Sequence, residues 1–148
     1  LGEFQDGLYH GQGRLTAEGY VYEGAFALGQ KNGRGKEVFE SGEQYEGDFV
    51  RNERAGHGVL RVADEDGNAL SYDGTFKGGV FAGQGKLTVV DASFEGEFKD
   101  NRFIRGVIRT KQGKTIEMDG EKQTYFEVLK DGKKVPVDPK ALISPPEG

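Results

Sequence analysis

The sequence predicts an all-β fold, an elongated single-layer antiparallel sheet of stacked β-hairpins with about five repeats of about 22 residues and a C-terminal capping hairpin. Two phrases that recur in register predict it. The first is an aromatic residue, an acidic residue, glycine, any residue and phenylalanine, as in residues 45–49. After a short turn comes the second, a Gly-x-Gly pair followed by an apolar residue. Such a period indicates a repeat architecture in which each copy buries its apolar surface against its neighbours.

The first phrase occurs at residues 22–26, 45–49, 72–76 and 94–98, with a clipped copy at 2–4. Its central glycines are separated by 22, 23, 27 and 22 residues. The second phrase occurs at Gly11 and Gly13, Gly33 and Gly35, Gly56 and Gly58, Gly83 and Gly85, and at Gly106 with Ile108 replacing the second glycine. Two phrases that keep step along the chain exclude a chance pattern.

This pair of phrases resembles the MORN repeat (membrane occupation and recognition nexus) over Leu1 to about Asp119. The resemblance implies the stacked-hairpin fold. It also implies a range of roles, because members of that family act as cytoskeletal and ciliary scaffolds, membrane tethers and targeting appendages of enzymes. The fold is therefore better specified than the function.

Each copy reads as one antiparallel hairpin. Tyr22, Gly24 and Phe26 alternate onto one face of a first strand, and Gly58 and Leu60 do the same on a second strand. Polar, glycine-bearing segments such as residues 27–32 and 77–79 are typical of the turns between them. A lone hairpin is at best marginally stable in water, so the copies must stack side by side.

Glycine weakens the interior of a strand, so the central glycines need a reason. We expect the missing side chain to leave room for an aromatic ring over bare backbone. Glu37 stands where other copies have leucine. A local bulge that turns Glu37 outward is the favoured interpretation, and a polar patch in the groove is the alternative.

The 27-residue step carries an extra loop at residues 63–69. Its acidic residues resemble a calcium loop superficially, but Ala69 and Thr75 occupy the places where that loop needs glycine and glutamate. A hairpin turn at Asp66 and Gly67 is the better interpretation.

We divide the chain into a repeat array at residues 1–114, a degenerate repeat and C-terminal cap hairpin at 115–139, and a flexible tail at 140–148. The cap hairpin turns at Asp131 and Gly132. Pro136 and the pair Lys133 and Lys134 are residues of the kind that protect an edge strand from aggregation.

Composition narrows the function classes. The formal net charge of -5 disfavours a nucleic-acid partner. There is no cysteine, and no nucleophile, base and metal-ligand constellation stands out, so we predict no enzyme, no cofactor and no metal. His10 and His57 lie about two repeats apart, where a structural role is favoured. An intermolecular zinc site shared with carboxylates remains as an alternative.

The leading hypothesis is a non-catalytic scaffold that binds a partner's helical or extended segment along an aromatic groove. The candidate contact residues are Tyr9, Tyr22, Tyr45, Tyr72, Phe81 and Phe94. Packing between hairpins is an equal alternative for the row of Tyr22, Tyr45, Tyr72 and Phe94. Accessory repeats of a larger enzyme, such as a lysine methyltransferase or a lipid kinase, are a further alternative that the resemblance implies.

Charge is unevenly placed along the chain. Residues 37–73 hold ten acidic residues against three basic ones, whereas residues 99–114 hold six basic residues against one acidic residue. The candidate contacts for an anionic phospholipid or an acidic partner are Arg102, Arg105, Arg109, Lys111 and Lys114. A solvated strand pair with no partner is the alternative.

The sequence shows no signal peptide and no apolar run long enough to span a membrane as a helix. It begins without methionine inside a repeat, so we expect a fragment or a processed form. The expected location is cytoplasmic, in association with the cytoskeleton or a membrane, with an organelle-imported processed form as the alternative. A homodimer or larger assembly is compatible with this interpretation.

Overall fold

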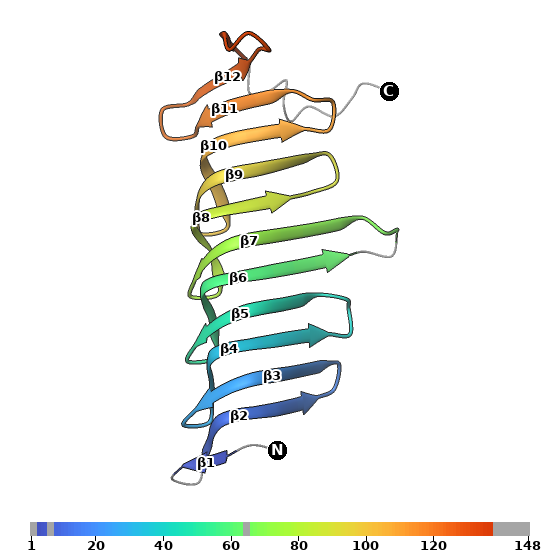
Figure 1. Cartoon of the computed structure of the whole chain (residues 1–148), viewed down its shortest axis with the longest axis vertical. Coiled ribbons are helices and arrows are strands. Elements are labelled where there is room, and N and C mark those ends of the chain that lie inside the picture. Colours follow the sequence, from blue (N-terminus) through green and yellow to red (C-terminus); the bar gives the residue numbers. More distant parts are fainter. Residues whose placement is uncertain (1–2, 6–7, 64–65, 138–148) are drawn as a thin grey trace.

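The computed structural model describes residues 3–5, 8–63 and 66–137, and their side chains from residue 10 onward. They form a single open antiparallel sheet in which thirteen strands follow one another in sequence order (Figure 1). The strands are β1 (Glu3–Gln5), β2 (Leu8–Ala17), β3 (Tyr20–Ala27), β4 (Gln30–Phe39), β5 (Gln44–Val50), β6 (Glu53–Ala63), β7 (Ala69–Lys77), β8 (Val80–Thr88), β9 (Ala92–Lys99), β10 (Arg102–Thr110), β11 (Thr115–Asp119), β12 (Thr124–Val128) and β13 (Lys134–Pro136). None of the described residues lies in a helix. The predicted all-β sheet of stacked hairpins is confirmed.

Figure 1 shows an elongated ribbon whose turns alternate between two long edges. One edge carries two-residue turns such as Arg51–Asn52 and Asp100–Asn101, in which both residues have positive φ. That geometry matches the right-handed twist of the flanking strands. Two asparagines also connect neighbouring hairpins. The Oδ1 atom of Asn52 accepts a hydrogen bond from the Lys31 N–H at 2.9 Å, and that of Asn101 accepts one from the Phe81 N–H at 2.8 Å.

Glycines pair with glycines across the whole repeat array. The row runs through Gly13, Gly24, Gly35, Gly47, Gly58, Gly74, Gly85, Gly96 and Gly106, and it ends opposite Met118. Beside this row the register shifts within every second strand pair, as between Gly47 and Asp48. Gly56 and Gly83 take positive φ values of 57° and 65° in these bulges. The bulges bend the strands, as bulges commonly do.

The register corrects one detail of the repeat alignment. Gly106 pairs with Gly96 and therefore occupies the place of the second glycine of the other pairs. Ile108 pairs with Phe94 and Ile116 and so occupies the place of Leu60 and Leu87. The last hairpin differs because Gly106 lies three positions after Phe103, whereas Gly85 lies four positions after Phe81, the equivalent of Phe103.

The expected packing of rings over glycine backbone is present. A Cβ atom added to Gly47 would lie 2.6 Å from the Tyr45 hydroxyl oxygen and 2.7 Å from the carbonyl oxygen of His57. The Tyr45 ring belongs to the same strand as Gly47 and covers Gly58 on the next strand. Its hydroxyl group donates a hydrogen bond to the carbonyl oxygen of Asp48 at 2.9 Å. The ring is thereby fixed over the glycine pair.

The core is a chain of edge-to-face ring contacts that runs along the ribbon. The Tyr45 ring contacts Phe49 and Phe76 with ring centroids 5.1 and 5.0 Å apart, and Tyr72 contacts Phe76 and Phe98 at 5.2 and 5.1 Å. Each contact is near the preferred aromatic geometry and adds to the free energy of burial. Because each tyrosine lies between a phenylalanine of its own hairpin and one of the next, the hairpins depend on one another for burial.

Burial should delay the ionisation of these tyrosines in alkali. Loss of solvent raises the pKa of Tyr22, Tyr45 and Tyr72 from 10.0 to about 12. Since the pKa is higher in the folded state, this stabilisation is complete below pH 10 and is lost as pH rises through about 12. We expect absorbance at the tyrosinate band to rise in two phases in the native protein and in one phase near pH 10 in guanidinium chloride. A single native phase near pH 10 would contradict the burial.

The last two strands form the expected terminal hairpin. β12 and β13 pair with Phe126 opposite Pro136, and their turn contains Gly132 at φ 87°. β13 is the outer strand of the sheet, and all three of its residues are exposed. The proline removes one backbone donor from this edge. The tail predicted for residues 140–148 lies outside the described residues.

Candidate functional site

The two faces of the sheet differ in chemistry. We call the face that carries Tyr22, Tyr45 and Tyr72 the inner face, and the opposite face the outer face. One row of paired residues follows the inner face: Leu15, Tyr22, Glu37, Tyr45, Leu60, Tyr72, Leu87, Phe94, Ile108 and Ile116. The matching outer row is mostly charged, with opposite charges side by side, such as Arg14 beside Glu23 and Lys86 beside Glu95, and it is interrupted by Val59 and Val107. The inner face is therefore the candidate binding surface.

The structure separates the six candidate contact residues into groups. Tyr22, Tyr45 and Tyr72 have no exposed side-chain surface, so a partner on the inner face would not reach them. These three residues pack between hairpins, as the alternative proposed. The prediction that they contact a partner is therefore corrected. Phe81 and Phe94 are half-buried on the inner face and remain accessible. Tyr9 lies in β2, but its side chain is outside the described part of the structure.

Phe81 belongs to a row that covers the buried rings. Its ring stacks on Tyr72 with centroids 3.9 Å apart and an interplanar angle of 7°. Arg54 and Lys31 occupy the position of Phe81 in the two preceding hairpins. Arg54 lies over the Tyr45 ring at 4.8 Å, and Lys31 lies 5.6 Å from the centroid of the Tyr22 ring. Cation–π contact thus replaces stacking in the N-terminal half of the ribbon.

Glu37 is buried on the inner face, so the prediction that it turns outward is wrong and the polar-patch alternative is correct. Its carboxylate accepts hydrogen bonds from Lys31 Nζ at 2.9 Å, Arg54 Nε at 3.0 Å and the Tyr20 hydroxyl at 2.5 Å. Arg54 also contacts Glu43 at 2.8 Å. Only 4% of Glu37 is exposed. A charge can be buried here because every oxygen of the carboxylate is paired.

The electrostatics of Glu37 follow from these partners. Burial alone would raise the pKa of its carboxyl group, but the hydrogen bonds from Tyr20, Lys31 and Arg54 outweigh burial and lower the pKa below 4.5. Burial and the bond to Glu37 also raise the pKa of the Tyr20 hydroxyl. The N-terminal half of the inner face therefore holds a charge-neutral ionic cluster of Lys31, Glu37, Glu43 and Arg54.

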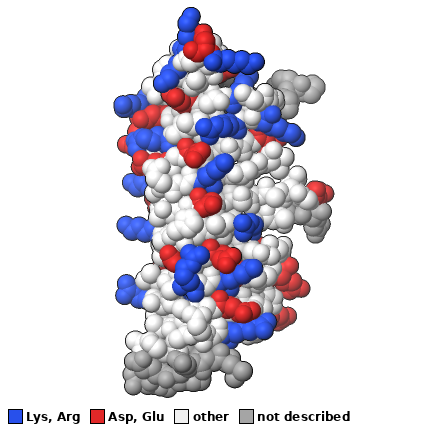
Figure 2. All heavy atoms as spheres, in the orientation of Figure 1, with Lys and Arg blue, Asp and Glu red and all other residues white. Residues whose placement is uncertain are grey.

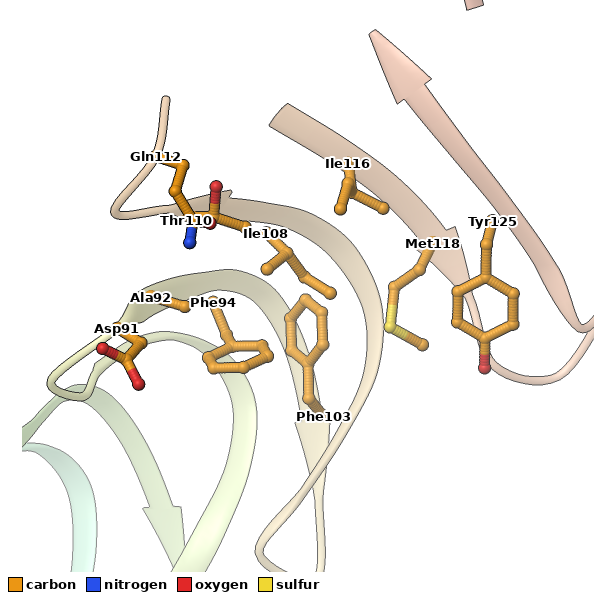
Figure 3. Close-up of a pocket in the computed structure, with 10 residues that line it drawn as sticks. All are labelled: Asp91, Ala92, Phe94, Phe103, Ile108, Thr110, Gln112, Ile116, Met118 and Tyr125. Carbon is orange, nitrogen blue, oxygen red and sulfur yellow. The ribbon is translucent and has the colours of Figure 1, made fainter. Parts of the chain in front are cut away.

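The C-terminal half of the inner face contains an apolar pocket of about 430 Å³. It is lined by Asp91, Ala92, Phe94, Phe103, Ile108, Thr110, Gln112, Ile116, Met118 and Tyr125 (Figure 3). Figure 3 shows Phe94, Phe103 and Ile108 between the turn residues on one side and Met118 and Tyr125 on the other. This volume lies within the range of about 300 to 1,000 Å³ that is usual for ligand pockets.

Three departures from the repeat pattern open this pocket. The first departure concerns the position two residues before the leading aromatic residue of each full copy of the first phrase. This position holds Tyr20, Glu43, Leu70 and Ala92 in turn. Ala92 is the smallest of these residues. Phe94 lacks the hydroxyl group that ties the tyrosines to a backbone carbonyl, and the glycine row ends at Met118.

The basic segment does not form one surface of unpaired charge. Arg105 is paired with Glu97, Asp119 and Glu121, and Arg109 is paired with Glu95 at 3.1 Å. Lys111 and Lys114 lie in the turn between β10 and β11, where they are exposed, as is Arg102 at the other edge of the sheet. Within the described residues these three have no ion-pair partner. An anion would therefore meet fewer free charges than the sequence suggested.

His57 lies apart from this surface. His57 Nε2 is 2.7 Å from Asp73 Oδ1 in an exposed pair on the outer face. Among the residues that the structure describes, no group of three or more His, Asp or Glu side chains is arranged to hold a metal ion. The described part of the chain also contains no helix of the length and apolarity needed to cross a bilayer.

Sequence reasoning missed both the ionic cluster and most of the pocket residues. The sequence contained a signal for the pocket, because the side chain at this repeat position is large in Tyr20, Glu43 and Leu70 but small in Ala92. The signal for the ionic cluster was weaker. It consisted of two basic residues, Lys31 and Arg54, at the repeat position that Phe81 occupies in a later hairpin.

Comparison with protein families agrees with the repeat register. A family model described as MORN repeat matches residues 1–18, 22–44, 45–66 and 72–91, more than half of the chain. Apart from Asp91, the pocket residues follow the last matched segment.

Proposed function

Since the chain belongs to the MORN-repeat family, we propose that it is a non-catalytic scaffold that binds a helical or extended segment of a partner protein along its inner face. Repeats of this family are generally non-enzymatic. The observation that carries the proposal is the continuous half-buried apolar surface of the C-terminal half. It comprises Val62, Leu70, Phe81, Leu87, Phe94, Phe103 and Ile108.

The arrangement of this surface favours a segment that crosses several strands. Phe81 on β8 and Phe103 on β10 lie two strands apart, or about 10 Å at the usual strand spacing. A bound segment could place successive apolar side chains against these rings, since aromatic residues at the centre of a contact supply much of the binding energy. The outer face, with its charge ladder, is the less suitable surface.

Two adjacent residues on β8 allow a matched test. Leu87 is on the inner face and Lys86 is on the outer face. A photo-crosslinking amino acid at position 87 should form partner adducts in cell extract, whereas the same group at position 86 should not. Substitution of both Phe81 and Phe94 by alanine should reduce the adducts at position 87 at least tenfold. Equal adducts at both positions, or adducts insensitive to the double substitution, would refute binding at the inner face.

A further inference from the structure

We propose that the pocket between β9 and β12 receives one bulky apolar side chain of the bound segment, and that Lys111 and Lys114 pair with acidic residues that flank this side chain. This inference rests on the proposed function and specifies the chemical class of the partner. The recognised sequence would combine a Phe, Trp, Leu or Met anchor with Asp or Glu nearby.

The walls of the pocket select an apolar anchor. Phe94, Phe103, Ile108 and Ile116 present rings and aliphatic groups, and Met118 adds a thioether on a flexible side chain. Methionine adapts to irregular shapes and makes favourable contacts with aromatic rings. A charged group placed among these residues would lose its water without gaining a partner.

The edge beside the pocket selects negative charge. The Lys111 N–H donates to the Asp91 carbonyl at 2.8 Å, and the Lys114 N–H donates to Thr110 Oγ1 at 3.1 Å. The first bond holds the lysine turn against the neighbouring turn that contains Asp91, and the second closes the lysine turn itself. The side chain of Asp91 supplies the single acid of the lining. Lys130 is exposed in the next turn of the same edge. The pocket edge therefore has a positive balance, although the whole chain is negative.

The charge at this end of the edge contrasts with the other turns on the same side. The turns before β3, β5 and β9 contain Glu18, Glu40, Glu43 and Asp91 and no basic residue. Figure 2 shows acidic side chains along the right-hand edge of the lower half and basic side chains in its upper part. An acidic segment would be repelled from the lower turns and attracted to the turn at Lys111, so charge places it over the pocket.

A protein segment fits these features better than a lone fatty acid. Phe94 and Phe103 line the pocket and contact each other with ring centroids 5.5 Å apart, and Phe103 also contacts Phe98 in the chain of rings at 5.2 Å. The pocket is thus continuous with the apolar surface at Phe81 and Leu87. An occupant that continues beyond the pocket can use both surfaces.

The test uses the full chain and a phage library of random twelve-residue peptides. Enriched peptides should share a bulky apolar residue with Asp or Glu within about three positions. Ala92→Tyr introduces the residue type found at Tyr20 and should fill the pocket. Fluorescence anisotropy should then show at least tenfold weaker binding of a selected synthetic peptide. The double variant Lys111→Glu and Lys114→Glu should weaken peptide binding at least tenfold and remove most of the salt dependence of the affinity.

The matched control is Lys99→Glu with Arg102→Glu, which makes the same charge change at exposed positions on the opposite edge. This control variant should bind the selected peptide with an affinity within threefold of that of the unsubstituted protein. Thermal melting checks that each variant is folded, and the lysine variants keep the test valid if Ala92→Tyr does not fold.

The outcomes separate this inference from the proposed function. Peptides that need Phe81 and Leu87 but show no acidic preference and no response to the lysine variants would overturn the inference and leave the proposed function standing. A library that yields no peptide dependent on the inner face would overturn both. Displacement of a pyrene-labelled fatty acid by decanoate, with no selected peptide, would assign the pocket to a lipid and would also overturn the inference.

Discussion

Gly47→Ala is expected to lower the free energy of unfolding by at least about 3 kcal/mol and the melting temperature by roughly 6 to 12 °C. The added Cβ atom would lie 2.6 Å from the Tyr45 hydroxyl oxygen and 2.7 Å from the His57 carbonyl oxygen. One of these neighbours is backbone, so the clash cannot be relieved by turning a flexible side chain. Relief requires the strand pair to separate or the Tyr45 ring to leave the core. Urea denaturation followed by circular dichroism measures the effect.

Gly78→Ala is the matched control. Gly78 has a positive φ of 59°, but an added Cβ would have no heavy atom within 4 Å outside its own residue and the two adjacent ones. The substitution should therefore cost only the backbone penalty of about 1 to 2 kcal/mol. If Gly47→Ala were no more destabilising than Gly78→Ala, the close packing of rings on glycine backbone would not be what holds the hairpins together.

Glu37→Leu is expected to destabilise the protein by about 3 to 5 kcal/mol, although leucine is the residue found at this place in other repeats. Removal of the carboxylate leaves Lys31 Nζ and Arg54 Nε without the acceptor that lies 2.9 and 3.0 Å away. The side chains of Lys31 and Arg54 are only 15% and 16% exposed, so water cannot fully replace it. Chemical denaturation of the variant and the original chain gives the difference.

The triple variant Lys31→Phe, Glu37→Leu and Arg54→Phe should recover most or all of that loss. It reproduces the arrangement of the hairpin in which Phe81 stacks on Tyr72 at 3.9 Å beside Leu87. Replacement of buried ions by apolar residues is often neutral or stabilising. Glu43, which loses Arg54 in this variant, can be hydrated because 35% of its side chain is exposed. A triple variant as unstable as Glu37→Leu would show that the cluster contributes more than the pairing of its own charges.

The acid response gives an independent measurement of the same cluster. The pKa of Glu37 is lower in the folded state, so its stabilisation is present above pH 4.5 and is lost as pH falls through the folded-state pKa. The original chain should therefore lose stability in acid faster than the triple variant. Parallel curves for the two proteins between pH 6 and pH 2 would contradict the assigned pairing.

Local spacing was sufficient to predict most of the architecture. The alternation at residues 45–49 and the spacing of the glycines fixed the strands, the hairpins and the role of Gly47. It was not sufficient for the last repeat, where Ile108 was aligned with a glycine. That error arose because the bulge in the final hairpin is one residue shorter, and the length of a bulge is visible only in the pairing of Gly96 with Gly106.

The candidate site was less predictable than the fold. Tyr45 and Phe81 are both aromatic residues of the repeat, and spacing alone does not tell which of them covers the other. The burial of Glu37 was not predictable from local spacing, because its partners lie far from it in the sequence. Lys31 is six positions earlier on the same strand, β4, and Arg54 is 17 positions later on β6 of the next hairpin.

The amino-acid sequence by itself determined that the chain forms stacked hairpins, because the period-two alternation and the paired glycines leave no other regular structure with one apolar face. The tertiary structure decided which members of that face are accessible. Phenylalanine rings of neighbouring strands, together with Lys31, Arg54 and Phe81, bury the three tyrosines. The small side chain of Ala92, by contrast, leaves space over Phe94. Burial and vacancy are set by neighbours on other strands, so they are properties of the assembled sheet.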